Sequence, residues 1–233
     1  MADKFDRIVL AVPELAAAIA QYRQLLGRAP GLPDTPGQPA AAWWGLSNTV
    51  IELVQAEVPD ERLQGIVLSA GTAPDREAAV PHALGIDVRL GDGRATAAFR
   101  RSQPAAQCPG LGIDHVVLRT DDADACIGLF SGQLGIRLAL DKTVPQWGGR
   151  MLFFRAGKLT LEVIESGADD SAGTAFWGLA YQCPDLDAHA DALAQRGVAV
   201  SAVRDGRKPG TRVATVKSHC LGIPTLLIQP ARA

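Results

Sequence analysis

The sequence lacks any strong excess of charge. Its 23 basic and 25 acidic side chains leave a formal net charge of -2, so the balance does not favour a polyanionic partner. It also lacks a run rich in lysine and arginine, and no basic stripe is interleaved with aromatic residues. We therefore expect neither nucleic acid nor a membrane surface as a partner.

Long apolar stretches and paired cysteines are also missing. The apolar runs are far shorter than the roughly 20 residues of a membrane-spanning helix. Residues 1–12 (MADKFDRIVLAV) place charges where a signal peptide would have its apolar core. The 4 cysteines, Cys108, Cys126, Cys183 and Cys220, form no Cys-x-x-Cys pair, and we interpret them as free thiols of a reducing compartment. A cytoplasmic protein is expected.

Several motifs of common enzyme classes are absent. The chain has no Gly-x-Gly-x-x-Gly fingerprint after a strand, no Walker loop and no Gly-x-Ser-x-Gly elbow, so dinucleotide, ATP and serine-hydrolase functions lose their main support. The composition is nevertheless that of a folded protein, with 47% hydrophobic and 21% charged residues in a chain of 233. That length allows one large domain or two of ordinary size.

A repeated unit runs along the chain, and repeats of this kind decide the fold. Residues 5–10 and 113–118 are β-branched runs typical of a buried strand. After each run, apolar residues at i, i+3 and i+4 spacing indicate a helix. The helices end at Leu26-Gly27 and Leu134-Gly135, where glycine suits the left-handed position that closes a helix.

Two weaker copies fill the remaining sequence. Residues 65–70 precede a predicted helix from about Asp75 to Leu84, and residues 178–182 precede another over 185–195. The second copy lacks a clear last strand. The further strands predicted for the four units are residues 43–46, 49–55, 86–90, 95–100, 151–155, 159–165, 198–203, 212–217 and 224–229.

The stretch 103–112 contains two prolines and two glycines and is the predicted linker between halves. We predict an N-terminal pair of units over residues 1–105, without an active site, and a C-terminal pair over residues 111–233 with the ligand cavity. A single unit cannot bury its sheet face, so pairing should close a curved sheet with helices outside. The predicted fold is α+β: four βαβββ modules, the second truncated, paired into two cups of mixed β-sheet.

The opening strands of the first and third units carry a family resemblance. Asp6-Arg7 and Asp114-His115, each followed by β-branched residues, resemble the motif D-H-[IV]-x-[FL]-x-V-x-D-[LM] of vicinal oxygen chelate modules. Residues 51–54 and 161–164 resemble the last strand of such a module. Nearly the whole chain is thus similar to the glyoxalase/bleomycin resistance/dioxygenase superfamily. The resemblance implies histidine and glutamate ligands for a metal that chelates two neighbouring substrate oxygens.

Carried onto this chain, the motif gives an incomplete metal site. The first-strand ligand positions are Arg7, Gly65, His115 and Gly178, and the last-strand glutamate positions are Glu52, Glu162 and Leu226, with no counterpart identified in the second unit. We interpret Arg7 and Glu52 as an ion pair that links two strands of the N-terminal sheet. In the C-terminal half only two of these positions can ligate, fewer than the three or four of a dedicated site. A divalent metal cofactor is therefore less expected than none.

His115 and Glu162 are the predicted catalytic residues, and three roles stay open for them. They can be part of a metal site. Glu162 can instead orient the imidazole so that His115 acts as general base. The third role is structural, as a hydrogen-bonded pair at the bottom of the cup.

Residues on nearby strands and loops are predicted to bind substrate. Arg119 and Gln182 fall on the cup side by the alternation of strand residues. In the loop 145–150, Trp147 can form a wall of an apolar pocket and Arg150 can meet the polar end of the ligand. The same alternation lets only one residue of the Trp43-Trp44 pair face the N-terminal cup.

The loop 206–212 concentrates cations beside a Pro-Gly turn. Arg207 and Lys208 can hold a substrate carboxylate or phosphate there, or the loop is a solvated hairpin. His219-Cys220 falls in a predicted tight turn and is weak evidence for a catalytic pair. The remaining histidines, His82 and His189, are predicted on the exposed side of helices.

The predicted function follows from the resemblance and these residues. The protein is expected to bind a small organic molecule, apolar or aromatic with an anionic or oxygen-rich end, in the C-terminal cup. As an enzyme it would be a glyoxalase-like lyase, an isomerase or an extradiol-dioxygenase-like oxidoreductase. The alternative is a metal-free binding or sequestering protein of the resistance type. Because four units in one chain supply two cups, a monomer is expected ahead of a homodimer.

Overall fold

The computed structural model describes residues 2–33, 39–71, 77–103, 110–144, 149–165 and 173–231. The N-terminal half contains β1 (Lys4–Val12), α1 (Leu15–Leu26), β2 (Ala41–Gly45), β3 (Val50–Gln55), β4 (Arg62–Ser69), β5 (Ala78–Ala79), β6 (Asp87–Gly91) and α2 (Arg94–Ser102). The C-terminal half contains β7 (Gly112–Thr120), α3 (Ala123–Ile127), the π-helix η1 (Gly128–Gln133), β8 (Arg137–Val144), β9 (Gly149–Ala156), β10 (Leu159–Glu165), β11 (Ala175–Gln182), α4 (Leu186–Gln195), β12 (Arg204–Asp205), β13 (Arg212–Val216) and β14 (Thr225–Gln229).

The strands form two mixed sheets, which confirms the predicted α+β fold. The N-terminal sheet has six strands in the order β2-β3-β1-β4-β6-β5, and the C-terminal sheet has eight in the order β12-β13-β14-β11-β7-β10-β9-β8. In both sheets the first strand of a unit pairs in parallel with the last strand of the same unit and antiparallel with the first strand of the next. The division into residues 1–105 and 111–233 stays a prediction.

The two halves use the same strand register, as expected of a repeat. In the N-terminal sheet Val9 lies opposite Glu52 on one side and Gly65 on the other. In the C-terminal sheet Val117 takes the same place between Glu162 and Gly178. The positions compared from the sequence are therefore equivalent in space.

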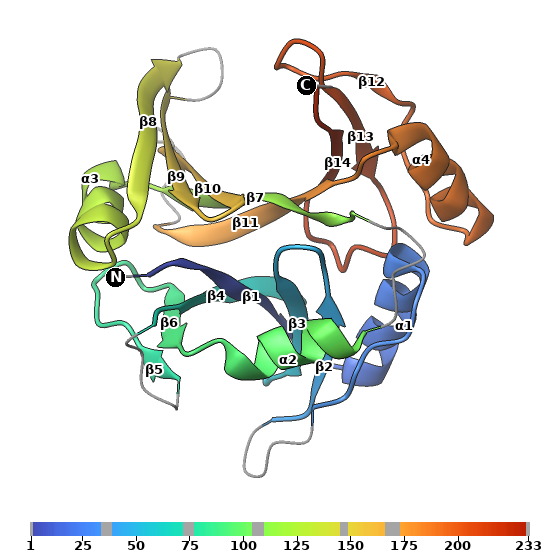
Figure 1. The fold of residues 1–233 in the computed structure, drawn as a ribbon, viewed down its shortest axis with the longest axis horizontal. Helices are drawn as coiled ribbons and strands as arrows, with labels where there is room; N and C mark the ends of the chain where they lie inside the picture. Colours follow the sequence, from blue (N-terminus) through green and yellow to red (C-terminus); the bar gives the residue numbers. More distant parts are fainter. Residues whose placement is uncertain are drawn as a thin grey trace.

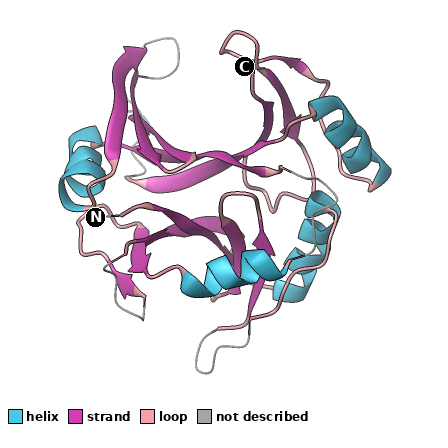
Figure 2. Ribbon diagram, in the orientation of Figure 1, coloured by secondary structure: helices cyan, strands magenta, loops and turns pink. Residues whose placement is uncertain are grey.

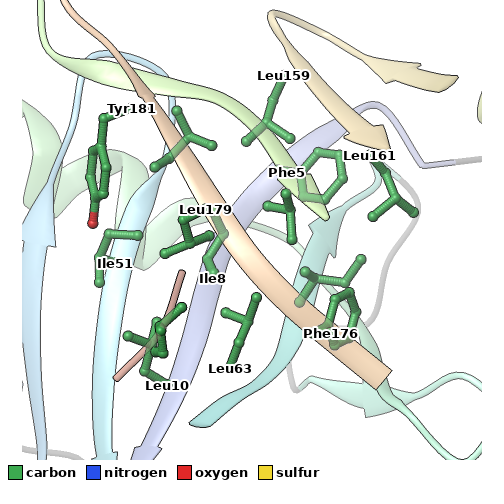
Figure 3. Packing of buried hydrophobic residues seen from close by; sticks show 14 of the residues in the cluster. Phe5, Ile8, Leu10, Ile51, Leu63, Leu159, Leu161, Phe176, Leu179 and Tyr181 are labelled. Atoms are coloured by element: carbon green, nitrogen blue, oxygen red, sulfur yellow. The ribbon is translucent and has the colours of Figure 1, made fainter. Parts of the chain in front are cut away.

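The two sheets pack back to back (Figure 1). One face of each contributes to a single buried apolar cluster, in which Ile8 and Leu10 of β1 meet Leu179 of β11 (Figure 3). The opposite faces point away from this shared core because strand side chains alternate. We call the outward face that carries Arg7 and Glu52 the N-terminal concave face. The outward face that carries His115 and Glu162 is the C-terminal concave face.

Local sequence explains where the helices begin and end. Asp185 caps α4 by accepting a hydrogen bond from the backbone N–H of Ala188 at 3.0 Å. Asp122 caps α3 in the same way through Ala125. Gly27 closes α1 with a φ of 69°, a conformation that glycine adopts without strain. None of the described helices is long and apolar enough to cross a membrane.

The second unit departs from the expected pattern in two places. The predicted helix up to Leu84 is wrong for residues 77–84, which contain the short strand β5 and irregular backbone. Pro81 stands inside that segment, and proline disrupts a helix interior by removing an N–H donor and crowding the preceding turn. The strand predicted over 95–100 is also wrong, because these residues lie in α2. Alanine and arginine, which dominate α2, are among the best helix formers.

Helix α2 lies on the N-terminal concave face, on the side away from the C-terminal half (Figure 2). Phe99 of α2 meets Trp43 of β2 edge to face, with ring centroids 5.5 Å apart. Arg100 holds the end of the helix by donating to the backbone oxygen of Leu46 at 2.9 Å. The expectation that helices lie outside the cups is therefore wrong for α2.

Two predictions for the last unit and the histidines also need correction. Residues 198–203 contain only an isolated bridge, from Val200 to Val216, rather than a strand. His189 is buried on α4 instead of exposed, because it lies on the helix face that covers the sheet. His82 lies outside any helix.

Candidate functional site

An ion-pair network occupies the N-terminal concave face. The Arg7 guanidinium donates to Glu52 Oε2 at 2.8 Å and to Asp6 Oδ2 at 3.1 Å, and it also pairs with Glu77. The Arg7 side chain is only 10% exposed. Although burial alone would lower the pKa of Arg7, the neighbouring glutamates raise it above its usual value. The predicted Arg7–Glu52 pair is confirmed.

Aromatic and helical contacts complete the same network. Trp43 Nε1 donates to Glu52 Oε1 at 2.8 Å, so both carboxylate oxygens of Glu52 have donors. The Arg7 guanidinium lies 5.4 Å from the centre of the Trp43 ring, within the range of a cation–π contact. Thr96 of α2 donates to Asp6, whose pKa is raised chiefly by burial. This face is thus satisfied internally and partly covered by α2.

The C-terminal concave face carries a different arrangement at the equivalent positions. His115 Nε2 lies 3.6 Å from Glu162 Oε2, and the two side chains are 18% and 16% exposed. That separation is too long for a hydrogen bond. His115 Nδ1 instead bonds Asp114 Oδ2 at 2.9 Å. The structure therefore brings the two predicted catalytic residues together without joining them.

Glu162 lacks the donors that Glu52 has. Phe153 of β9 lies opposite Glu162, where Trp43 lies opposite Glu52 in the N-terminal sheet. Phenylalanine has no N–H to offer. Within the described ranges, no group forms a hydrogen bond with Glu162, so its carboxylate stays available to a ligand.

Large apolar side chains accompany this pair on the same face. Trp177 is 41% exposed and Leu140 is 48% exposed. Trp177 sits at a bulge between Phe176 and Gly178 and points away from the core that Phe176 enters. The Arg119 guanidinium lies 4.6 Å from the centre of the Trp177 ring. Apolar surface and a cation therefore lie on the same face as the polar pair.

The other predicted site residues are placed as follows. Gln182 ends β11 on the strand face of Gly178 and is half-buried. Arg150 lies away from this face, because its guanidinium pairs with Asp141 and with Asp124 of α3, all at 2.8–2.9 Å. Trp147 lies outside the described residues.

The basic loop forms a compact hairpin between β12 and β13. The N–H of Gly206 donates to the Thr211 oxygen at 2.9 Å, and the N–H of Thr211 donates to the Lys208 oxygen at 3.1 Å. Arg207 and Lys208 are exposed. Their place in a binding site stays a prediction.

The turn after β13 and the cysteines follow the sequence interpretation. His219 and Leu221 adopt left-handed backbone conformations, with φ of 61° and 54°, as a tight turn requires. Cys126, Cys183 and Cys220 are buried thiols, whereas Cys108 lies outside the described residues.

The C-terminal donor set does not fit the metal site that the family resemblance implies. A side chain at Gly178 would place its Cβ 2.7 Å from the backbone oxygen of Pro224, so no ligand can replace this glycine without a backbone shift. Leu226, opposite Ala180, has no donor atom. Across the part of the chain that the structure describes, no three His, Cys, Asp or Glu side chains converge to hold an ion. Two donors are too few for a dedicated site.

Two residues of this face were missed from the sequence. Asp114 was seen only as part of the strand motif, although its position next to His115 suggested a partner for the imidazole. No sequence pattern indicated that Trp177 faces the C-terminal concave face, because the β-bulge that turns it there leaves no pattern in the sequence.

Residues 114–215 match the family model described as Glyoxalase/Bleomycin resistance protein/Dioxygenase superfamily. Over these residues, which lie in its C-terminal half, the chain is similar to this superfamily. Members of the superfamily bind small molecules. No curated protein matches the sequence.

One solved structure has the same fold over the whole chain. A triple mutant of 4-hydroxymandelate synthase from Streptomyces coelicolor aligns with a TM-score of 0.74 and 14% identity, covering 100% of this chain and 94% of that chain. Methylmalonyl-CoA epimerase from Mycobacterium tuberculosis aligns at 24% identity and a TM-score of 0.45, covering 57% of this chain and 95% of that chain. At such low identity the first likeness shows the fold alone.

Proposed function

We propose that the protein binds a small aromatic molecule with an anionic end on the C-terminal concave face, without a dedicated metal site. One observation carries the proposal: Glu162 and His115 face each other at 3.6 Å without a hydrogen bond, whereas the equivalent Glu52 is saturated by Arg7 and Trp43. A partly buried carboxylate without a donor is costly in a structural site. Such groups are typical of sites that a ligand completes.

The neighbouring side chains indicate the chemistry of the ligand. Trp177 offers exposed apolar surface, which suits a planar or aromatic body. Arg119 can meet a carboxylate with its two-pronged guanidinium while its plane stays over the Trp177 ring. An aromatic carboxylate matches both features.

The N-terminal concave face lacks these features. Its carboxylates are paired with Arg7, and Phe99 of α2 covers Trp43. A ligand there would have to displace a helix and break buried ion pairs, which is expensive. The binding or sequestering alternative, which needs no metal, is therefore the function that the residues of this chain support best.

Calorimetric titration of the purified protein with 2-naphthoate tests the proposal. We expect saturable binding, weaker binding of 2-naphthylmethanol, which lacks the carboxylate, and weaker binding of decanoate, which lacks the ring. Trp177→Ala should weaken 2-naphthoate about tenfold, the size of a lost stacking and cation–π contact. The matched control is Trp43→Phe, on the N-terminal concave face, which should leave the affinity unchanged. No binding by any of the three compounds, or equal losses in both variants, would contradict the proposal.

A further inference from the structure

We infer that Asp114, His115 and Glu162 form a cradle with two hydrogen-bond acceptors, shaped for a hydroxyl group on the ligand. The inference rests on the proposed function and deepens it, because it names the group that the ligand presents to the polar pair. Asp114 is the positioning residue, and it acts through the imidazole.

The hydrogen bond to Asp114 determines which imidazole nitrogen of His115 carries the proton. A carboxylate can only accept hydrogen bonds, so the 2.9 Å contact with Asp114 requires that His115 Nδ1 carries the proton. In a neutral imidazole the other nitrogen is then an acceptor. This assignment of the tautomer follows from the bonding partner. Nε2 therefore turns a lone pair toward the C-terminal concave face.

His115 Nε2 and the Glu162 carboxylate are two acceptors that face each other. Nε2 and the Glu162 carboxylate oxygen are 3.6 Å apart, and with the imidazole neutral and the carboxylate ionised neither has a hydrogen to give the other. Phe153, which replaces the tryptophan of the N-terminal half, supplies none either. A single O–H group placed between the two acceptors can donate its hydrogen to one of them or share it between both.

The charge near the pair favours a hydroxyl over an ammonium group as the donor. Arg155 already brings a cation close to the pair, because it donates to Thr160 Oγ1 at 2.7 Å and Thr160 lies opposite His115 in the adjacent strand. A neutral hydroxyl supplies the missing donor without adding a second cation next to Arg155. An alcohol or phenol is therefore favoured over an amine.

The separation of His115 and Arg119 along β7 sets the length of the ligand. His115 and Arg119 are four residues apart on the same face of β7, a separation of about 13 Å between their Cα atoms at the rise of a strand. A molecule that touches both side chains is elongated, with its hydroxyl at one end and its carboxylate at the other. Trp177, beside Arg119, would lie along its aromatic body.

A matched set of rigid ligands tests the cradle. We expect 6-hydroxy-2-naphthoate to bind about tenfold more tightly than 6-methoxy-2-naphthoate and 2-naphthoate, since only the first carries the donor. The preference should disappear in Glu162→Ala and in His115→Phe, which keeps a ring but removes Nε2. Tighter binding of 6-(aminomethyl)-2-naphthoate than of the hydroxyl compound would overturn the choice of a hydroxyl.

The role of Asp114 has its own readout, independent of any ligand. Nitrogen-15 NMR of the imidazole should show the proton on Nδ1 in the wild type and on Nε2 in Asp114→Ala, which should also lose the preference for the hydroxyl. A proton on Nε2 in the wild type would refute the cradle. Equal binding of all the naphthoates would refute the cradle and leave the proposed function standing, whereas no binding by any of them would overturn both.

Discussion

Replacement of Arg7 by methionine is expected to destabilise the fold severely. Methionine keeps most of the apolar stem but removes the guanidinium. Asp6 and Glu52, whose side chains are 5% and 12% exposed, would then lose their cation. Breaking a buried ion pair by removing one partner typically costs about 3–5 kcal/mol, because a charge is left without compensation. Glu77, at 31% exposure, can turn to water and adds little.

Urea unfolding followed by circular dichroism measures this loss in Arg7→Met. The expected 3–5 kcal/mol is a large part of the roughly 5–15 kcal/mol that stabilises an ordinary domain. Addition of Glu52→Gln should recover part of the loss, because the amide carries no charge and its oxygen still accepts from Trp43. The matched control is Arg150→Met, which breaks ion pairs with Asp141 and Asp124 at the surface and should change stability far less. If both arginine variants lose the same amount, the network does not stabilise the fold.

Three further predictions concern packing, pH and thiol reactivity. Gly178→Ala should cost about 1–3 kcal/mol, because its Cβ would meet the Pro224 oxygen. In contrast, Gly128→Ala, in a helical segment with open space, should leave the urea midpoint unchanged or raise it. Burial lowers the pKa of His189 below 6.5, so the neutral form favours folding. Stability present above pH 6.5 should fall as the pH drops below it, and His189→Gln should flatten that fall between about pH 7.5 and pH 5.5. Equal slopes of stability against pH in the wild type and in His189→Gln would contradict the assignment of this pH dependence to His189. Burial raises the pKa of the Cys126 thiol to about 11, so mass spectrometry after treatment with a thiol reagent at pH 8 should find Cys126 modified only in the unfolded protein. Rapid modification of the folded protein would show that this thiol is accessible.

Much of the fold could be predicted because local signals agree with the tertiary structure. The β-branched runs that contain Arg7 and His115 became the central strands β1 and β7, since such runs suit a sheet buried on one face. The Arg7–Glu52 pair was predicted because the repeat aligned both residues with the ligand positions of the third unit. Register then followed from the alternation of strand residues.

The second unit shows where the repeat misled the prediction. Residues 95–100 have the composition of a helix, yet the repeat pattern predicts a strand there. Pro81 argued against the predicted helix up to Leu84 more strongly than the repeat argued for it. The position of α2 could not be read from the sequence in any case, because it depends on a contact between Phe99 and Trp43.

The candidate site was only partly predictable for similar reasons. The identities of His115 and Glu162 marked the positions. The lack of a donor between them depends on Asp114, which bonds His115 Nδ1, and on Phe153, which lies opposite Glu162. Both effects depend on strand register and side-chain direction. Arg150 has the right chemistry and lies in the predicted loop. Its neighbours in space, rather than its residue type, direct it toward α3.

Hydrogen exchange of the backbone amides with and without 6-hydroxy-2-naphthoate tests directly whether the C-terminal concave face binds the ligand. We expect slower exchange in β7, β10 and β11, around His115, Glu162 and Trp177, when the ligand is present. Exchange in β1, β3 and α2 should stay unchanged. Protection confined to those N-terminal elements would contradict the assignment of the C-terminal concave face as the binding face.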